Sequence, residues 1–219
     1  MKVVNLSDHN SLLSIYVSEM RDVNVQHDSM RFRRNIERIG EVMAYELSKT
    51  LNYDLRELTT PLAPARCPQL ADKVVLATIF RAGLPMHTGM LNYFDHAENA
   101  FVSAYREYTD ESHTDVKINI EYLASPRLDD KVLVIADPML ATGGSMELAY
   151  KALLTKGTPR QVHLCCIIAA QQAVEYMKQV FTEDNITLWV AAVDPVLNER
   201  KYIVPGLGDA GDLAFGIKE

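Results

Sequence analysis

Hydrophobic residues along this chain form two kinds of pattern, continuous apolar runs and runs with helical spacing. The continuous runs are typical of strands that are buried on both faces of a sheet. They lie at 73–80, 132–136, 162–169 and 186–193. Helical patterns lie at 84–91, 145–156 and 171–181. Strands that alternate with helices at this spacing predict an α/β fold with a parallel central sheet, right-handed crossovers and flanking helices on both faces.

The N-terminal part of the chain predicts one long amphipathic helix. Over 29–49 the apolar residues recur every three or four positions, with charged residues on the other faces, and Ser29 is the predicted N-cap. The segment that follows, 60–72, contains three prolines. We therefore predict that 60–72 is a connection without regular structure.

Two extended segments separated by a polar stretch predict a β-arm or flap. The extended segments are 101–105 and 116–122, and the polar stretch between them, 107–115, has few apolar anchors. The sequence contains neither internal repeats nor low-complexity tracts, so a single domain over 1–219 is the simplest organisation.

Charge and composition restrict the partners of this chain. A formal net charge of −7 disfavours non-specific nucleic-acid binding, which needs an electropositive face. No apolar run is long enough to cross a membrane, and no signal peptide is recognisable. We therefore expect a cytoplasmic protein with no nucleic-acid or membrane partner.

Several side chains that often carry chemistry are predicted to be structural. Cys165 and Cys166 lie inside an apolar run, as packing thiols do, and no cysteine has metal-ligand spacing. Trp189 is predicted to pack in the sheet. The histidines predicted to be non-catalytic are His87, His96, His113 and His163.

The densest chemical signal follows the apolar run 132–136. This loop comprises Asp137, Pro138, Met139, Leu140, Ala141, Thr142, Gly143, Gly144 and Ser145. Its two adjacent glycines let backbone N–H groups approach an anion at the start of a helix, so the loop predicts a phosphate site. The alternative is a plain tight turn with Ser145 as the helix N-cap.

Two arginines at predicted strand ends are further candidates for anion binding. Arg81 follows 73–80 and Arg106 lies at the base of the predicted flap, and a guanidinium is well matched to phosphate. Arg81, Asp137 and Asp194 all lie just past predicted strands, where α/β sheets bind ligands. The strand and loop at 132–145 contain neither the GxxxxGK[ST] nor the GxGxxG motif, which disfavours ATP hydrolysis and dinucleotide binding at this loop.

The C-terminal segment 202–212 predicts a second binding loop. Its closely spaced glycines disfavour a helix or an ordinary strand and favour a rigid loop that presents backbone N–H and C=O groups. Such groups suit the edge of a small planar amide-like molecule. The alternatives are a structural terminal turn, or a metal site formed by Asp209 and Asp212.

In this order the segments resemble the uracil phosphoribosyltransferase family over essentially the whole chain. The matching stretches are 80–84, 105–106, 137–145 (DPMLATGGS), 197–199 and 202–212, which contains PGLGDAGD. The resemblance implies the phosphoribosyltransferase fold, with a hood built from the terminal segments 1–50 and 195–219. It also implies transfer of ribose 5-phosphate from 5-phosphoribosyl 1-diphosphate (PRPP) to N1 of uracil, which gives UMP and diphosphate.

The same resemblance implies roles for the candidate residues. Residues 137–145 would hold the ribose and 5′-phosphate of PRPP, while Arg81 and Arg106 would hold its diphosphate. Asp209 would face both PRPP and uracil. The residues implied to bind uracil are Ile203, Gly208, Asp209 and Ala210. The implied catalytic residues are Asp137, Arg106 and Asp209. The implied cofactor is Mg²⁺, held mainly through PRPP and not directly by the protein.

Some points stay open at the level of sequence. Pro85 stands where the family usually has glycine, and proline lacks the N–H that could contact diphosphate. Relatives suggest a homodimer or larger homo-oligomer and GTP as a candidate effector. The alternative functions are a phosphoribosyltransferase with altered base specificity or low activity, and a UMP-sensing RNA-binding regulator, which the acidic net charge disfavours.

Overall fold

The computed structural model describes residues 1–108 and 116–218, with side chains for all of these except those between 104 and 119. Its centre is an eight-stranded sheet in the order β1-β10-β9-β7-β4-β5-β6, with β8 paired to β9. The strands are β1 (Lys2–Asn5), β4 (Val74–Phe80), β5 (Glu98–Tyr108), β6 (Val116–Ala124), β7 (Val132–Ala136), β8 (Met139–Leu140), β9 (Gln161–Ala170) and β10 (Ile186–Asp194). Apart from the antiparallel β5–β6 pair, the described strands of this sheet pair in parallel, which confirms the predicted α/β class.

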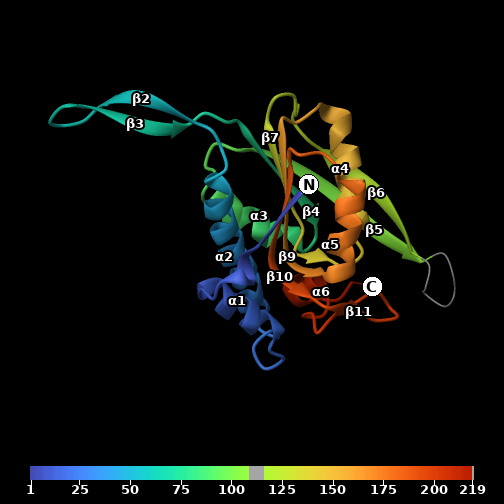
Figure 1. Ribbon diagram of the computed structural model, residues 1–219. Helices are drawn as coiled ribbons and strands as arrows, with labels where there is room; N and C mark the ends of the chain where they lie inside the picture. Colours follow the sequence, from blue (N-terminus) through green and yellow to red (C-terminus); the bar gives the residue numbers. More distant parts are fainter. Residues whose placement is uncertain (109–115, 219) are drawn as a thin grey trace.

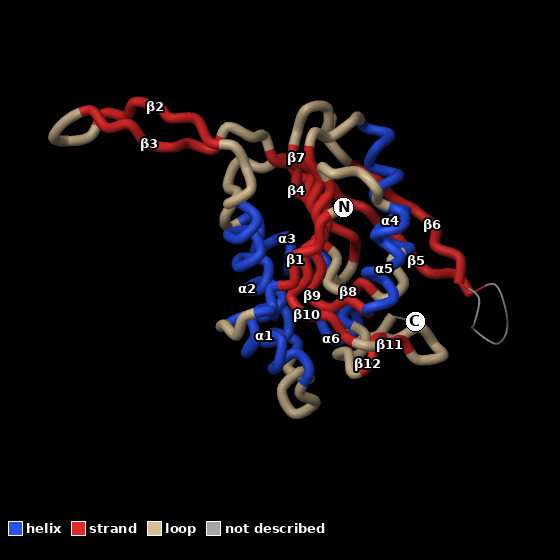
Figure 2. The backbone as a smooth tube through the Cα atoms, in the orientation of Figure 1, coloured by secondary structure: helices blue, strands red, loops and turns tan. Residues whose placement is uncertain are grey.

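Helices cover both faces of the sheet, as predicted. Figure 1 and Figure 2 show α1, α2 and α3 on one face, α4 and α5 on the other, and α6 at the carboxyl edge of the strands. The helices are α1 (Leu12–Arg21), α2 (Ser29–Ser48), α3 (Gly83–Leu91), α4 (Gly144–Leu153), α5 (Gln171–Val180) and α6 (Ala210–Phe215), with 3₁₀ turns at Leu6–Asp8 and Leu154–Lys156. None of the helices in the described part of the chain has both the length and the apolarity that a membrane crossing requires.

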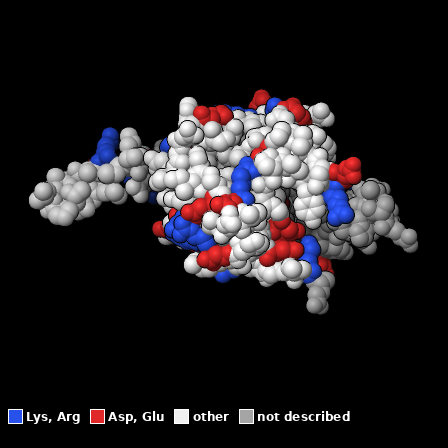
Figure 3. All heavy atoms as spheres, turned by 90° about the horizontal axis from the view of Figure 1, so that it is seen from below, with Lys and Arg blue, Asp and Glu red and all other residues white. Residues whose placement is uncertain are grey.

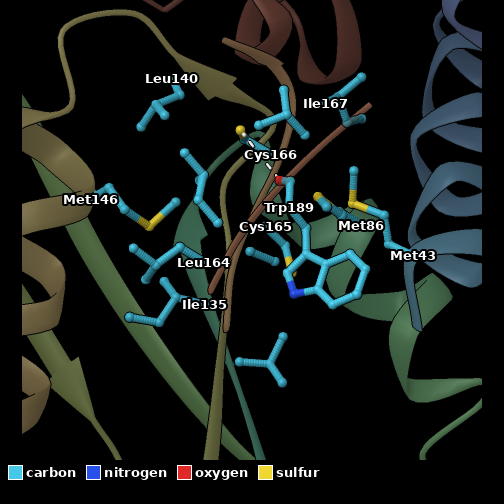
Figure 4. Packing of buried hydrophobic residues seen from close by; sticks show 14 of the residues in the cluster. Met43, Met86, Ile135, Leu140, Met146, Leu164, Cys165, Cys166, Ile167 and Trp189 are labelled. Atoms are coloured by element: carbon cyan, nitrogen blue, oxygen red, sulfur yellow. Dashed lines mark hydrogen bonds between the residues drawn. The ribbon is translucent and has the colours of Figure 1, made fainter. Parts of the chain in front are cut away.

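The core consists of the apolar strands and the helix faces that pack on them. Figure 4 shows Met43 and Met86 on one side of the sheet and Met146 and Leu140 on the other. Cys165 and Cys166 are fully buried between these layers, and burial raises the pKa of both thiols. Trp189 is also buried in the sheet. The cysteines and the tryptophan are therefore core residues, as the sequence predicted.

Two local predictions were wrong. The N-cap of α2 is Asp28, whose side chain accepts a hydrogen bond from the backbone N–H of Arg31 at 3.0 Å, and Ser29 is already helical. The segment 60–72 is not a structureless connection, because β3 (Pro64–Leu70) pairs with β2 (Tyr53–Thr59) in a hairpin. Prolines fit there because each strand of an isolated hairpin has a free edge where no N–H is required. Figure 1 shows this hairpin, the β2–β3 arm, extending away from the sheet.

The predicted flap corresponds to the β5–β6 pair. The two strands are antiparallel, with Tyr108 opposite Val116, and both are longer than the sequence pattern indicated. Residues 107 and 108 belong to β5, and the rest of the predicted flap, 109–115, lies outside the described residues together with His113. Strand pairing extends β5 because its backbone is supported on one side by β4 and on the other by β6.

Candidate active site

Three polar residues lie at the carboxyl ends of neighbouring parallel strands. Arg81 directly follows β4, Asp137 directly follows β7, and Asp194 ends β10. These strands belong to the continuous order β10-β9-β7-β4, so their carboxyl ends lie along one edge of the sheet. This is the edge at which open α/β sheets bind ligands.

The loop between β7 and α4 is attached to β9 by backbone hydrogen bonds. The N–H of Asp137 donates to the carbonyl of Cys165 at 3.0 Å. The carbonyl of Pro138 accepts from Ile167 and Ile168, each at 3.0 Å. With its first half fixed in this way, the loop leads into the N-terminus of α4, where unpaired N–H groups and the helix dipole favour an anion.

Gly143 makes the close turn from the loop into α4 possible. It is the N-cap of α4 with φ of +90°, a conformation that L side chains rarely adopt. A Cβ at this position would lie 2.8 Å from Cδ1 of Tyr176 on α5 and 3.1 Å from Sδ of Met177. Ser145 lies inside the helix and Gly143 is its N-cap, so the expectation that Ser145 caps this helix is wrong.

Arg81 connects the end of β4 with the C-terminal helix. Its Nη2 donates to Oδ1 of Asp212 at 2.6 Å, and its Nη1 donates to the carbonyl of Gly216 at 3.0 Å. About a third of its side chain is still exposed. The arginine predicted to bind diphosphate is therefore placed at the sheet edge, beside the segment predicted to bind the base.

The segment 202–212 is more regular than its glycines suggested. β12 (Ile203–Val204) pairs with β11 (Val196–Leu197), and α6 begins at Ala210. Asp209 caps α6, since its Oδ1 accepts from the N–H groups of Gly211 at 2.9 Å and Asp212 at 3.0 Å. The prediction of a loop throughout 202–212 was wrong because this cap lets a helix start within it. Only 205–209 lies between the two regular elements, and we call 203–210 the base loop.

Side chains from the N-terminal segment bind the base loop and α6, and the sequence did not predict these contacts. Arg21 forms a two-point ion pair with Asp194 at 2.7 and 2.8 Å, and both residues bind the backbone of Gly206. Gln26 Nε2 donates to the carbonyl of Leu207 at 3.3 Å. Arg33 Nη1 donates to the carbonyl of Ala214 at 2.6 Å. These bonds join the N-terminal segment to the C-terminal segment.

The structure also gives the positions of Arg106 and Pro85, the other two residues that the sequence related to diphosphate binding. The backbone of Arg106 lies in β5 opposite Ile118, and its side chain is outside the described residues. Pro85 is buried at the third position of α3. The first turn of a helix does not use its N–H groups internally, so the helix loses no hydrogen bond there.

Two of the histidines have the contacts of core residues. His87 Nε2 lies 2.8 Å from Oδ1 of Asn99, and burial lowers the pKa of His87. His163 is fully buried, and its Nδ1 accepts from Nε1 of Trp189 at 3.0 Å. Burial lowers the pKa of His163 to about 4. Within the residues that the structure describes, no group of three or more His, Cys, Asp or Glu side chains is arranged to hold a metal ion.

Comparison with known proteins identifies the family of this chain. A family model described as uracil phosphoribosyltransferase matches residues 6–217. The chain belongs to the uracil phosphoribosyltransferase family. It is 63% identical over 218 residues to a uracil phosphoribosyltransferase of Porphyromonas gingivalis, covering 100% of both chains. It is 40% identical over 191 residues to the enzyme of the same name from Methanothermobacter thermautotrophicus, covering 86% of this chain and 85% of that one.

A solved structure supports the family fold. The AQ2163 protein from Aquifex aeolicus superposes with a TM-score of 0.87 and is 30% identical, covering 98% of each chain. Coverage of this extent includes the N-terminal helices and the C-terminal segment as well as the sheet. The terminal elements therefore belong to the architecture that the two proteins share.

Proposed function

We propose that this protein is a uracil phosphoribosyltransferase of pyrimidine salvage, which transfers ribose 5-phosphate from PRPP to N1 of uracil and releases UMP and diphosphate. One observation carries the proposal in the structure. The phosphate-type loop 137–145 and the base loop 203–210 are brought to one sheet edge, where Arg81 contacts the helix that follows the base loop. The family relationship supports the same activity.

The loop 137–145 is proposed to hold the ribose and 5′-phosphate of PRPP. The N–H groups at the start of α4 suit the phosphate, and the hydroxyls of Thr142 and Ser145 supply further donors. Asp137 is proposed to face the ribose, where its carboxylate stabilises positive charge. The remaining residues proposed for this contact are Pro138, Met139, Leu140, Ala141, Gly143 and Gly144.

Arg81 and Arg106 are proposed to hold the diphosphate. A guanidinium offers planar paired donors that match phosphate oxygens. Arg81 already uses two of its nitrogens on Asp212 and Gly216, so diphosphate binding would exchange or share these contacts. The exchange would link the arrival of PRPP to the position of α6.

The base loop is proposed to bind uracil through the backbone of Ile203, Gly208, Asp209 and Ala210. Uracil carries an alternating set of carbonyl acceptors and N–H donors, which backbone groups at fixed spacing can complement. Gly208 has φ of +88°, so a glycine is needed for the turn. Asp209 is proposed to face PRPP as well, through the carboxylate whose Oδ1 caps α6.

The proposed chemistry depends mainly on charge and position. Cleavage of the bond between the anomeric carbon and diphosphate develops an oxocarbenium-like sugar and a polyanionic leaving group. Asp137 would stabilise the sugar, and Arg81 and Arg106 the leaving group. The base loop would hold N1 of uracil against the anomeric carbon, which lowers the barrier through orientation. As the bond from N1 to that carbon forms, N1 would lose its proton late in the step, to water. The proposed catalytic residues are Asp137, Arg106 and Asp209, the last because it would face both PRPP and uracil.

Magnesium is the proposed cofactor. The chemistry of the donor set fits it, because Mg²⁺ in phosphate-transfer sites is held by substrate oxygens with one or two carboxylates and not by a protein cage. Here Mg²⁺ would be held mainly through PRPP, whose ribose and 5′-phosphate the loop 137–145 would hold, and not directly by the protein. When bound, Mg²⁺ would neutralise charge on the diphosphate.

We also propose that residues 1–219 act as one domain that assembles into a homodimer or larger homo-oligomer. The hydrogen bonds between the N-terminal helices and the C-terminal segment support the single domain. The exposed leucines of the β2–β3 arm support assembly, because an apolar surface of this kind is usually covered by a partner. A cytoplasmic location and GTP as an effector are proposed from the family resemblance alone.

The test is an assay of purified protein with Mg²⁺, PRPP and labelled uracil, with hypoxanthine, orotate and cytosine in parallel. We expect UMP formation from uracil only. Formation of another nucleotide would favour the alternative of altered base specificity, and no nucleotide from correctly folded protein would contradict the proposal. Omitting Mg²⁺ and adding GTP test the cofactor and the effector.

An RNA-binding regulator is the second candidate, and the charges on one face of the molecule disfavour it. Figure 3 views the molecule from the side of α1 and α6, and on that face Lys and Arg side chains alternate with Asp and Glu side chains instead of forming one basic patch. Arginines of α2 are paired with acids, as Arg31 is with Glu19 and Arg34 with Glu37. RNA binding needs unpaired basic side chains on a common face.

A further inference from the structure

The carboxylate of Asp194 is the meeting point of three parts of the chain. It ends β10, and its side chain is 5% exposed. Oδ1 accepts from Nη2 of Arg21 at 2.7 Å, and Oδ2 accepts from Nη1 of Arg21 at 2.8 Å and from the N–H of Gly206 at 2.9 Å. Nη1 of Arg21 also donates to the carbonyl of Gly206 at 2.9 Å. The ion pair therefore forms hydrogen bonds with both the N–H and the carbonyl of Gly206.

We propose that Arg21 and Asp194 are positioning residues for the base, a pair that sets the affinity for uracil without touching it. The inference rests on the proposed function, because it takes the base loop 203–210 as the uracil site. The pair fixes Gly206, and the residues proposed to bind uracil lie within four positions of it, Ile203 before it and Gly208, Asp209 and Ala210 after it. A shift of Gly206 would displace their backbone groups from the geometry that the base requires.

The conformation of the base loop shows why hydrogen bonds that restrain Gly206 are needed. Gly206 has φ of +61°, and a Cβ there would run into the carbonyl oxygen of Ile203, so the chain folds back on itself at this point. Glycine is also the residue that leaves the chain most freedom when nothing holds it. Gln26 adds a second attachment, because its Nε2 bonds both the carbonyl of Leu207 and that of Met20. The loop is thus held by α1 and by the segment that follows α1.

The presence of a charged pair at these positions also indicates that its role is to position Gly206. A buried ion pair contributes little net stability compared with apolar side chains of similar volume, because both charges lose water. Directional hydrogen bonds, in contrast, specify one geometry. An apolar pair at these positions would fill the space but would leave the N–H and the carbonyl of Gly206 without these partners.

The experiment compares Arg21→Met with Arg31→Met. Arg31 makes a similar ion pair, with Glu19 at 2.7 Å, and this pair joins α2 to α1 and not to the base loop. We expect Arg21→Met to raise KM for uracil about tenfold or more while KM for PRPP changes less than about twofold. Hydrogen exchange of amides 203–210, measured without substrates, should accelerate by about tenfold. Arg31→Met should leave both quantities unchanged.

The outcomes separate this inference from the proposed function. If wild-type protein forms no UMP, the proposed function fails, and the exchange data still decide whether the pair holds the loop. If Arg21→Met leaves KM for uracil and loop exchange unchanged, or raises the KM of both substrates equally, the inference is wrong. If Arg21→Met does not fold, Gln26→Ala replaces it, with an expected rise of KM for uracil of about twofold or more. An unchanged KM in a folded Gln26→Ala protein would then overturn the inference.

Discussion

Arg81 donates a hydrogen bond to Asp212 at 2.6 Å, although 131 positions separate the two residues in the sequence. Arg81 follows the strand β4, and Asp212 lies in the helix that follows the base loop. A single hydrogen bond therefore links the arginine proposed to bind diphosphate to the helix that follows the proposed uracil site. A change in the position of the guanidinium would be transmitted to α6.

This hydrogen bond leads to a prediction about the separate effects of Arg81 and Asp212 on the KM for PRPP. Arg81→Ala should raise KM for PRPP about 10- to 100-fold, because it removes hydrogen bonds to a charged group that are worth about 1.5–3 kcal/mol. Asp212→Asn keeps the guanidinium and should raise KM for PRPP far less. Initial-rate kinetics with varied PRPP measure both. The control is Arg127→Ala, whose side chain is 89% exposed. Equal effects of Arg81→Ala and Asp212→Asn would show that the bond is structural.

A second prediction concerns the carboxylate at the start of the phosphate-type loop. Asp137→Asn should lower kcat by about 100-fold or more, because the neutral amide no longer stabilises positive charge on the sugar. Cys165→Ser is the matched comparison, since Cys165 lies next to the site in the sheet and its carbonyl accepts from Asp137 N–H at 3.0 Å. The carbonyl is retained in the serine variant, so kcat should stay near the wild-type value. Similar losses in both would contradict the assignment of Asp137.

The parallel core was predictable because its strands carry a local signal. β4, β7, β9 and β10 are continuous apolar runs, and their order with the helices between them leaves few topologies. The β2–β3 arm carried no such signal, because its residues are mostly exposed and its prolines suggested a loop. Its pairing depends on the opposite strand and not on burial.

The candidate site, like the fold, has parts that the sequence predicted and parts that it did not. Asp137 and Arg81 were predictable from their places after apolar runs. The Arg21–Asp194 contact was not, because 173 positions separate the two residues and no spacing rule relates them. The start of α6 was also missed, since the cap by Asp209 is a single side-chain contact inside a glycine-rich segment. Long-range pairs and local caps of this kind become visible only in three dimensions.

Gly143→Ala should destabilise the protein by about 1–3 kcal/mol, because the backbone keeps a φ of +90° and the new Cβ meets Tyr176 at 2.8 Å. For a chain of this size the midpoint of thermal unfolding should fall by about 2–10 °C. Scanning calorimetry measures it. In the double variant with Tyr176→Ala, the cost of Gly143→Ala should shrink without vanishing, because only the side-chain contact is relieved. An unchanged midpoint in the single variant would contradict the close approach.

The β2–β3 arm offers a test of assembly. Leu55 and Leu62 on this arm are 69% and 97% exposed. Replacing residues 54–69 by Asn-Gly, which suits a two-residue hairpin turn, should leave the thermal stability of the body unchanged but reduce the molecular mass to that of a monomer. Light scattering coupled to size exclusion measures the mass. Val23→Ser, at an exposed apolar residue between α1 and α2, should have no effect. An unchanged mass without the arm would exclude the arm as the interface.

The lowered pKa of the buried His163 predicts that the protein loses stability in mild acid. Its pKa is about 4 in the folded protein and 6.5 as the ordinary value, because burial disfavours the charged imidazole. Below pH 6.5 the unfolded chain therefore gains a proton that the folded protein does not, and the free energy of unfolding falls as the pH decreases toward 4. Since one pKa unit is worth about 1.4 kcal/mol, the contribution between pH 7.5 and 5.0 is about 2 kcal/mol.

Urea unfolding of His163→Gln at these two pH values isolates this contribution. Glutamine keeps an acceptor for Trp189 Nε1, whose bond to His163 is 3.0 Å long, but it does not titrate. His87, whose pKa burial also lowers, titrates in both proteins, so its effect cancels in the comparison. The pH-dependent loss should therefore be about 2 kcal/mol smaller in the variant than in the wild type. Equal losses would show that His163 does not remain neutral in the folded protein through this range.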